Sequence, residues 1–330
     1  MSALGTRRAW AELLRLPALF TVPGDALAGA AATGLRPNHR TLLAIGSSLC
    51  LYEAGMALND WADRAEDAVE RPERPLPSGR IAPPAALTAA TALTAAGLAL
   101  ASRAGRPALA VAGTLAGTVW AYDLVLKHTP AGPAAMATAR GLDLLLGATA
   151  TAGPDHTPRA RATAAAPSAA ALAAHTLAVT VVSRREAQGG SSTAPLAALA
   201  TTAALTTRLI GAARRSCPGG GGTWRGRGAP PATMRPGGGA PDLRNAVDTA
   251  RRALPGALAL AYAATAAKPL FHAALNPSPP LTQRAVGGGI RAMIPLQAAL
   301  AARTGAPATA LLTAALAPAA RRFARKVSVT

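Results

Sequence analysis

The sequence predicts an all-α membrane protein, a polytopic bundle of about nine transmembrane helices. Half of the 330 residues are hydrophobic, and the mean hydropathy is positive, +0.24, although the chain carries 34 lysines and arginines. The apolar residues gather in stretches of about 20, the length of helix that crosses a hydrocarbon core of ~30 Å. Alanine dominates these stretches and β-branched runs are rare, which favours closely packed helices over strands.

The apolar stretches follow one another closely, and a short one at 306–320 could close the last hairpin. In chain order the expected spans are residues 12–33, 38–58, 85–102, 107–126, 133–152, 165–182, 192–213, 253–275 and 286–303. The segment 214–252 interrupts the series, because its part from Cys217 to Pro241 is packed with Gly, Pro and Arg and is typical of a flexible loop. We therefore expect one domain over residues 1–330 that contains this loop.

The end of the second span carries the segment from Asn59 to Asp67, which concentrates carboxylates where lipid makes charge expensive. On one continuous helix, Asp60, Asp63 and Asp67 fall within an arc of about 60° and face one point. Hard oxygen ligands that leave positions open for water and phosphate suit Mg²⁺, and a diphosphate bridged by such ions is the expected guest. A solvated acidic helix end is the alternative.

Two ionisable groups lie inside the fifth span. Arg140 and Asp143 are three residues apart, so they share one helical face and point into the bundle. They could contribute to a substrate site, or they could neutralise each other as a structural ion pair.

The net charge of +19 does not indicate a nucleic-acid-binding protein, because the arginines are spread over loops and spans and only 3% of the residues are aromatic. Anionic lipid and diphosphate are the better partners. The short loops after the second, fourth and sixth spans hold the basic residues Arg64, Arg71, Arg74, Arg80, Lys127, Arg184 and Arg185. The positive-inside rule then predicts a multi-pass protein of the cell membrane with the acidic motif on the cytoplasmic side. The arginines of 214–252 contradict this rule, so nine and ten spans both remain open.

The acidic segment and the loop after it resemble a known family. Asn59-Asp60-x-x-Asp63-x-x-x-Asp67 is followed by Arg71-Pro72-x-Arg74-Pro75-Leu76-Pro77-Ser78-Gly79-Arg80-Ile81. Together they are similar to the first aspartate-rich motif and following loop of the UbiA family of membrane prenyltransferases, which has about nine transmembrane helices. The resemblance implies transfer of a polyprenyl group from a prenyl diphosphate to a lipophilic acceptor within the bilayer. It also implies that Asn59, Asp60, Asp63 and Asp67 bind Mg²⁺ and the diphosphate.

The resemblance extends to the end of the fourth span. Tyr122 and Lys127 resemble the family's loop there, where a cation can hold the diphosphate, and Arg71 and Arg74 are expected to help neutralise it as it departs. Lys127 could instead extend to the membrane surface, with Tyr122 in an aromatic belt.

The loop after the sixth span departs from the family, which has a second aspartate cluster at this place. Here the segment from Ser183 to Gln188 offers only the carboxylate of Glu186. The neighbouring Arg184 and Arg185 could bind a phosphate without a metal, or they could be a topology signal. The departure leaves a second hypothesis open, a UbiA-like component that binds or exports an isoprenoid diphosphate without turnover.

A further similarity indicates a subgroup. The segments His175-x-x-x-x-Thr180-x-x-Ser183-Arg184-x-Glu186-x-x-Gly189-Gly190 and Ile294-Pro295-Leu296-Gln297 resemble an actinobacterial UbiA-like branch related to EboC proteins.

Overall fold

The computed structural model describes residues 3–153, 158–186, 189–215 and 243–327, and these residues form helices and turns with no strand among them. The elements are α1 (Ala3–Leu13), the 3₁₀ helix η1 (Leu16–Thr21), α2 (Val22–Ala32), α3 (His39–Ala62), α4 (Arg64–Glu70), α5 (Pro83–Ala104), α6 (Arg106–Ala121), the π-helix η2 (Tyr122–Leu126), α7 (Gly132–Ala152), α8 (Pro158–Ser183), α9 (Thr193–Arg215), α10 (Leu243–Leu275), α11 (Pro279–Arg303) and α12 (Pro307–Val327).

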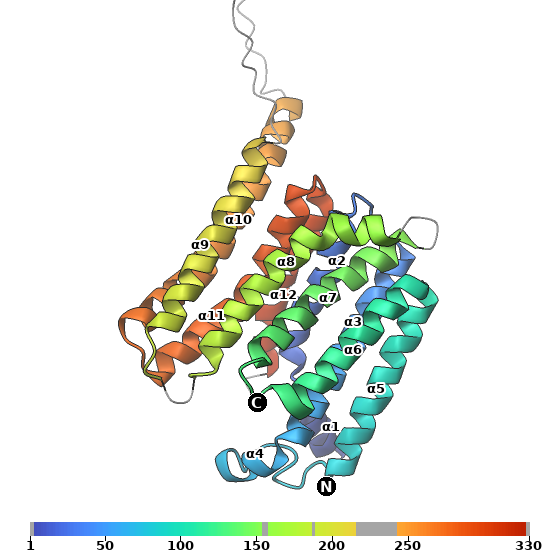
Figure 1. Ribbon diagram of the computed structural model, residues 1–330, viewed down its shortest axis with the longest axis vertical. Coiled ribbons are helices and arrows are strands. Elements are labelled where there is room, and N and C mark those ends of the chain that lie inside the picture. Colours follow the sequence, from blue (N-terminus) through green and yellow to red (C-terminus); the bar gives the residue numbers. More distant parts are fainter. Residues whose placement is uncertain (1–2, 154–157, 187–188, 216–242, 328–330) are drawn as a thin grey trace, which may run out of the picture.

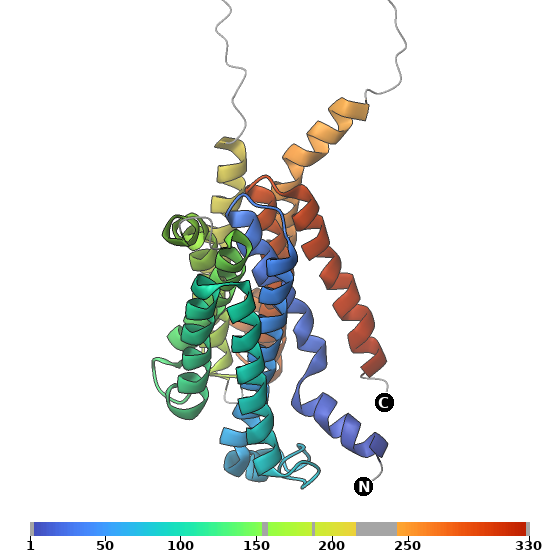
Figure 2. The ribbon, with the colours of Figure 1, turned by 90° about the vertical axis from the view of Figure 1, so that its right-hand side faces the viewer.

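The predicted all-α bundle is confirmed, because each of the expected spans coincides largely with helix. Among the described helices, six are long and apolar enough to cross a membrane, namely α3, α5, α6 with η2, α8, α10 and α11. The long helices run side by side in one bundle (Figure 1). In the view turned by 90°, α1 and the last turns of α12 lie at the same end of the bundle (Figure 2).

Two boundaries differ from the prediction. The first expected span, 12–33, is not one helix, since Arg15 adopts a left-handed conformation (φ 47°, ψ 46°) between α1 and η1. The expected loop 214–252 is too long at both ends, because α9 continues to Arg215 and α10 begins at Leu243. The middle of that loop, residues 216–242, lies outside the described residues.

Two glycines bring α2 and α7 into close contact. A Cβ on Gly29 would meet the carbonyl oxygen of Leu144, and a Cβ on Gly147 would meet the backbone of Ala26. Small residues at such crossings let membrane helices approach closely, which is how these helices gain packing in lipid. The close crossing places the start of α2 beside the polar residues of α7.

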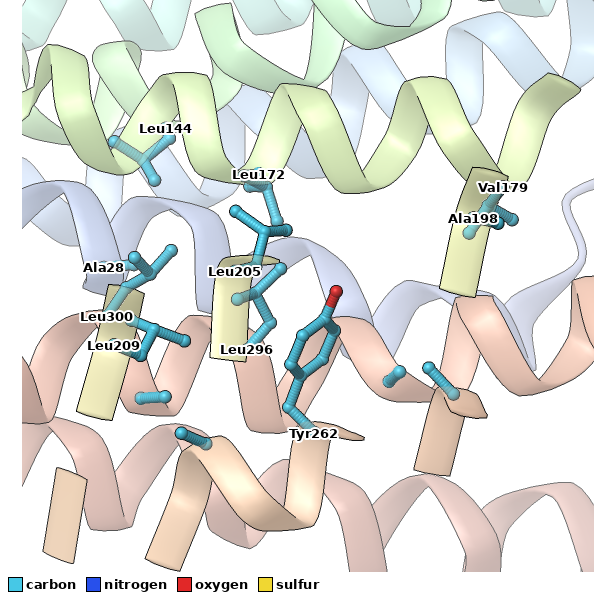
Figure 3. Close-up of a cluster of buried hydrophobic side chains, with 14 of the residues drawn as sticks. Ala28, Leu144, Leu172, Val179, Ala198, Leu205, Leu209, Tyr262, Leu296 and Leu300 are labelled. Carbon is cyan, nitrogen blue, oxygen red and sulfur yellow. The ribbon is translucent and has the colours of Figure 1, made fainter. Parts of the chain in front are cut away.

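The largest buried cluster joins α2, α7, α8, α9, α10 and α11, and Figure 3 shows Tyr262 among the leucines of this cluster. His175 Nδ1 lies 3.0 Å from the Tyr262 hydroxyl and Nε2 lies 3.0 Å from the carbonyl oxygen of Gly289. Because a carbonyl only accepts, Nε2–H donates to Gly289 and Nδ1 accepts from Tyr262. This histidine is therefore a satisfied core residue that ties α8 to α10 and α11.

Candidate active site

A cavity of about 700 Å³ lies among α3, α6, η2, α7 and the C-terminal end of α8. Its lining changes character along α3, from Asn59 at one end to Ser48 at the other. These two residues are eleven positions apart, which corresponds to about 17 Å along a helix. We call the end beside Asn59 the outer end and the end beside Ser48 the inner end. The outer end is charged, the middle is apolar and the inner end is polar. The charged, apolar and polar side chains that follow this order are Arg15, Asp63, Arg71, Arg74, Lys127, His128, Arg184 and Glu186, then Leu51, Met56, Leu115, Val119 and Met136, then Ser48, Arg140 and Asp143.

Most of the residues predicted for the site line this cavity. They are Asn59, Asp63, Arg71, Arg74, Tyr122, Lys127, Arg140, Arg184 and Glu186. Asp60 and Asp67 are buried, with exposed fractions of 5% and 2%, beneath the arginines at the outer end. Arg185 is exposed and, within the described part of the chain, is not among the lining residues.

The acidic motif does not lie on one continuous helix. α3 ends at Ala62, and Asp63 (φ −85°, ψ 4°) forms the junction before α4 begins at Arg64. The predicted common face of the three aspartates is therefore wrong. Asp63 lies at the junction and lines the cavity, whereas Asp60 and Asp67 come together from two different helices.

Arginines connect the two buried aspartates. Arg74 Nη1 lies 2.7 Å from Asp67 Oδ2 and 3.7 Å from Asp60 Oδ1. Arg15 Nη2 lies 3.1 Å from the same oxygen of Asp60, and Arg71 Nη1 lies 3.4 Å from Asp67 Oδ1. Buried carboxylates are stable only when paired, so these guanidinium groups hold the motif in place.

The loop after α4 is folded so that these arginines face the motif. The backbone N–H of Ser78 donates to the carbonyl of Arg74 at 3.0 Å, and the N–H of Ile81 donates to the carbonyl of Pro75 at 3.0 Å. Leu76 and Ile81 are buried against α1 and α3. Because both ends of the loop are fixed, the position of Arg74 over Asp67 follows from the packing.

Lys127 forms the opposite wall of the outer end. Its Nζ lies 2.5 Å from Asp63 Oδ1, and only 9% of its side chain is exposed. The π-helix η2 ends here with the N–H of Lys127 donating to the carbonyl of Tyr122 at 2.9 Å, and such wide turns are frequent at functional sites. Four residues before Lys127, Asp123 Oδ1 accepts a hydrogen bond from Asn59 Nδ2 at 3.0 Å, which joins α3 to η2. Lys127 is thus a cavity residue, and the surface alternative does not hold.

The segment after α8 contributes one acidic and one basic residue to the lining of the cavity. Glu186 lines the cavity, and partial burial raises its pKa while the nearby guanidinium of Arg71 opposes the rise. Arg184 Nη1 donates to the carbonyl of Thr129, so the end of α8 is tied to the turn before α7. Of the two adjacent arginines, only Arg184 is placed to meet a ligand.

The inner end of the cavity corrects the predicted pairing of Arg140 with Asp143. Arg140 Nε lies 3.1 Å from Asp25 Oδ2, and Gln297 Nε2 donates to the other oxygen of Asp25 at 2.6 Å. Asp143 accepts from the hydroxyl of Ser48 instead. The pairing differs because α2 crosses α7 so closely that its carboxylate reaches Arg140 from across the interface.

Sequence reasoning missed Arg15, Asp123, His128 and Ser48, all of which line the cavity. A signal was present for Arg15, since it lies just inside the expected first span, and an ionisable residue at membrane depth indicates function. Its contact with Asp60 spans 45 positions and is not visible in any local pattern.

The donor set fits a hard divalent cation. Ligand atoms of Asp63, Glu66 and His128 lie within 4.8 Å of one another, and Asp60 and Asp67 add two buried carboxylates nearby. Carboxylate oxygens are the protein ligands that Mg²⁺ prefers, whereas an imidazole nitrogen is not. The carboxylates, and not His128, would therefore hold Mg²⁺.

Comparison with known proteins shows the family. The model of the UbiA prenyltransferase family matches residues 18–214. The chain belongs to this family. The match includes the acidic motif, both sides of the cavity and the segment with Glu186, while Arg15 lies just before it.

The relatives are partial matches. A digeranylgeranylglyceryl phosphate synthase of Methanothrix thermoacetophila is 38% identical over 140 residues, which cover 41% of this chain and 52% of that protein. The corresponding synthase of Methanopyrus kandleri is 36% identical over 128 residues, 37% of this chain and 45% of that protein. The chain thus spans about half the length of these curated relatives. Their names give no support to the EboC-related branch.

Two solved structures share the fold. A UbiA homolog from Aeropyrum pernix, solved in its apo form, aligns with a TM-score of 0.56 at 19% identity, over 83% of this chain and 96% of that one. A structure described for digeranylgeranylglyceryl phosphate synthase in membranes aligns with a TM-score of 0.52 at 16% identity, over 92% and 99%. At these identities the similarity establishes the UbiA fold alone.

Proposed function

We propose that this protein transfers a polyprenyl group from a prenyl diphosphate to a lipophilic acceptor within the membrane, in a Mg²⁺-dependent reaction. The observation that carries the proposal is the cavity, whose charged outer end adjoins an apolar middle. A prenyl diphosphate, which has an anionic head and a hydrocarbon tail, matches that order of charged and apolar lining.

The residues of the outer end bind and neutralise the departing diphosphate. Lys127, Arg71 and Arg74 line the cavity and supply positive charge where the leaving group accumulates negative charge. The carboxylates of the acidic motif would hold Mg²⁺, which would supply further positive charge to the leaving oxygen. The bond between C1 of the prenyl group and that oxygen breaks, the diphosphate leaves with the electron pair, and the nucleophilic atom of the acceptor bonds to C1 and gives up its proton to the diphosphate.

The middle of the cavity keeps water away from the reactive carbon. Met56, Val119 and Met136 form an apolar wall next to Asn59 and Tyr122. Exclusion of water prevents hydrolysis of the allylic cation and strengthens the electrostatic contacts at the outer end. Catalysis by this chain then consists of holding the donor, stabilising the leaving group and excluding solvent.

Glu186 and Arg184 take the place of a second aspartate cluster in this proposal. Both line the cavity, and a guanidinium group matches phosphate oxygens without a metal ion. The site then needs fewer metal ions than one with two aspartate clusters. Arg185, which is exposed, is left as a topology signal.

Several features stay predictions. They are the single domain over 1–330, the cytoplasmic orientation of the site in the cell membrane, and the kinship with the EboC-related branch.

The relatives carry the word digeranylgeranylglyceryl in their names, so geranylgeranyl diphosphate is the first donor to test.

The experiment is a transfer assay in proteoliposomes, with Mg²⁺, labelled geranylgeranyl diphosphate and a lipid extract of the host as the source of acceptors. We expect a labelled prenylated lipid from the wild-type chain and a loss of at least about 100-fold in Asp63→Asn, the size expected for losing a major electrostatic contact to the leaving group. Asp248→Asn, on the exposed face of α10, is the matched control and should transfer normally. Tight donor binding without any product would favour the binding component instead, and absence of donor binding would contradict both.

A further inference from the structure

The acidic motif is already neutralised by side chains of the same chain. Asp60 contacts Arg15 at 3.1 Å and Arg74 at 3.7 Å, and Asp67 contacts Arg74 at 2.7 Å and Arg71 at 3.4 Å. Each of the two buried carboxylates therefore has two guanidinium partners, and one of these partners is shared.

The third aspartate is neutralised as well, by Lys127 at 2.5 Å from Asp63. In these ion pairs four positive side chains face three carboxylates. A magnesium ion that arrives alone finds no free carboxylate at Asp60 or Asp67. To bind there it would have to displace a guanidinium group from a buried carboxylate and leave that cation without its partner.

A diphosphate changes this balance. The side chains of Arg15 and Arg74 are 43% and 25% exposed and line the cavity, whereas those of Asp60 and Asp67 are only 6% and 3% exposed. The arginines can thus turn toward phosphate oxygens in the cavity, which their forked guanidinium groups match. When both turn, Asp60 is free to bind the metal, and Asp67 keeps Arg71 as its one remaining partner.

We propose that Arg15 and Arg74 are positioning residues that occupy Asp60 and Asp67 in place of a metal, so that the cavity takes up Mg²⁺ only together with a diphosphate. The inference rests on the proposed function, because it takes the outer end as the diphosphate site. The inference goes beyond the proposed function by coupling the two ligands: the diphosphate raises the affinity of the protein for the metal, and the metal raises its affinity for the diphosphate. By linkage the two factors must be equal.

The test is calorimetric titration of the full chain in lipid nanodiscs with MgCl₂, with and without saturating inorganic pyrophosphate. For the wild type we expect pyrophosphate to raise the Mg²⁺ affinity of the protein by at least about tenfold, within the usual range of such couplings. In Arg74→Gln the affinity for Mg²⁺ alone should rise and the coupling should fall below about threefold. Arg15→Gln should shift both quantities in the same direction.

Two controls separate this inference from a structural effect. Arg80→Gln removes an arginine of the same loop that contacts Glu12 and does not line the cavity, and it should leave the coupling unchanged. Arg74→Lys keeps the charge and should retain most of the coupling. If Arg74→Gln proves unfolded, Arg15→Gln decides the question.

The outcomes are distinct. Equal Mg²⁺ affinity with and without pyrophosphate in a wild-type protein that binds pyrophosphate overturns the inference and leaves the proposed function standing. A gain of Mg²⁺ affinity in Arg80→Gln equal to that in Arg74→Gln also overturns it. Failure to bind pyrophosphate at any Mg²⁺ concentration overturns the proposed function and the inference with it.

Discussion

Asp63 and Asp67 are four positions apart and have different surroundings. The side chain of Asp63 is 20% exposed, lines the cavity and contacts Lys127, while that of Asp67 is 3% exposed between two arginines. The difference follows from the helix break at Asp63, which turns α4 away from α3. One carboxylate of the motif therefore faces the cavity directly, and the other is covered by arginines.

Lys127→Gln tests the contact on the opposite wall. We expect the affinity for geranylgeranyl diphosphate to fall by about 10- to 100-fold, because a hydrogen bond to a charged group contributes ~1.5–3 kcal/mol. The measurement is equilibrium binding of labelled donor to protein in nanodiscs. Lys268→Gln is the matched control, since this lysine lies on α10 and does not line the cavity. Equal losses in the two variants would show a general effect of charge on the membrane protein.

At this scale the sequence predicted the polar residues well and their partners poorly. Carboxylates and basic residues are conspicuous in apolar surroundings, so Asn59, Asp63 and Lys127 stand out in the sequence alone. Partners such as Asp25 for Arg140 belong to other helices. Local spacing reports neighbours three or four residues apart, and long-range pairs depend on how the helices cross.

Helices were predictable as elements, because an apolar stretch of the right length has few alternatives in lipid. Their interruptions were not. The break at Asp63 and the π-helix at 122–126 contain no proline or glycine, so no local signal marks them. Both occur beside the cavity, where Asp63 and Lys127 belong to its lining.

Gly147→Ala tests the close crossing of α2 and α7. The new methyl group would overlap the backbone of Ala26, so we expect a lower thermal midpoint and a destabilisation of about 1–3 kcal/mol. Thermal unfolding followed by circular dichroism in detergent is the measurement. Gly113→Ala on α6 is the control, because a Cβ there meets nothing within 4 Å and alanine favours the helix. An unchanged midpoint in Gly147→Ala would mean that the two helices can separate at no cost.

Three short segments with basic residues lie at one end of the bundle. The loop after α3, the turn after η2 and the end of α8 lie at the same end of the bundle (Figure 1), and each contributes residues to the lining of the cavity. They hold the basic residues of the short loops, whereas the arginines of 214–252 belong to another segment. A cytoplasmic outer end follows from that charge distribution if the positive-inside rule applies to this chain.

Cysteine labelling tests the orientation. Ser78 and Ser102 are both exposed. Ser78 precedes α5 and Ser102 lies in its last turn, so they are near opposite ends of a helix of 22 residues, about 33 Å long. With Cys50 and Cys217 replaced, a membrane-impermeant maleimide should label Ser102→Cys in intact cells and Ser78→Cys only after lysis. The opposite pattern would place the cavity mouth outside the cell.

A structure with Mg²⁺ and an unreactive thio-diphosphate analogue of geranylgeranyl diphosphate tests most directly whether the cavity is the donor site. We predict that the diphosphate lies between Asp63 and Lys127, that Arg15 and Arg74 turn to it, and that the prenyl chain passes along Met56 and Met136. A diphosphate bound elsewhere, with the arginines still on Asp60 and Asp67, would contradict the assignment.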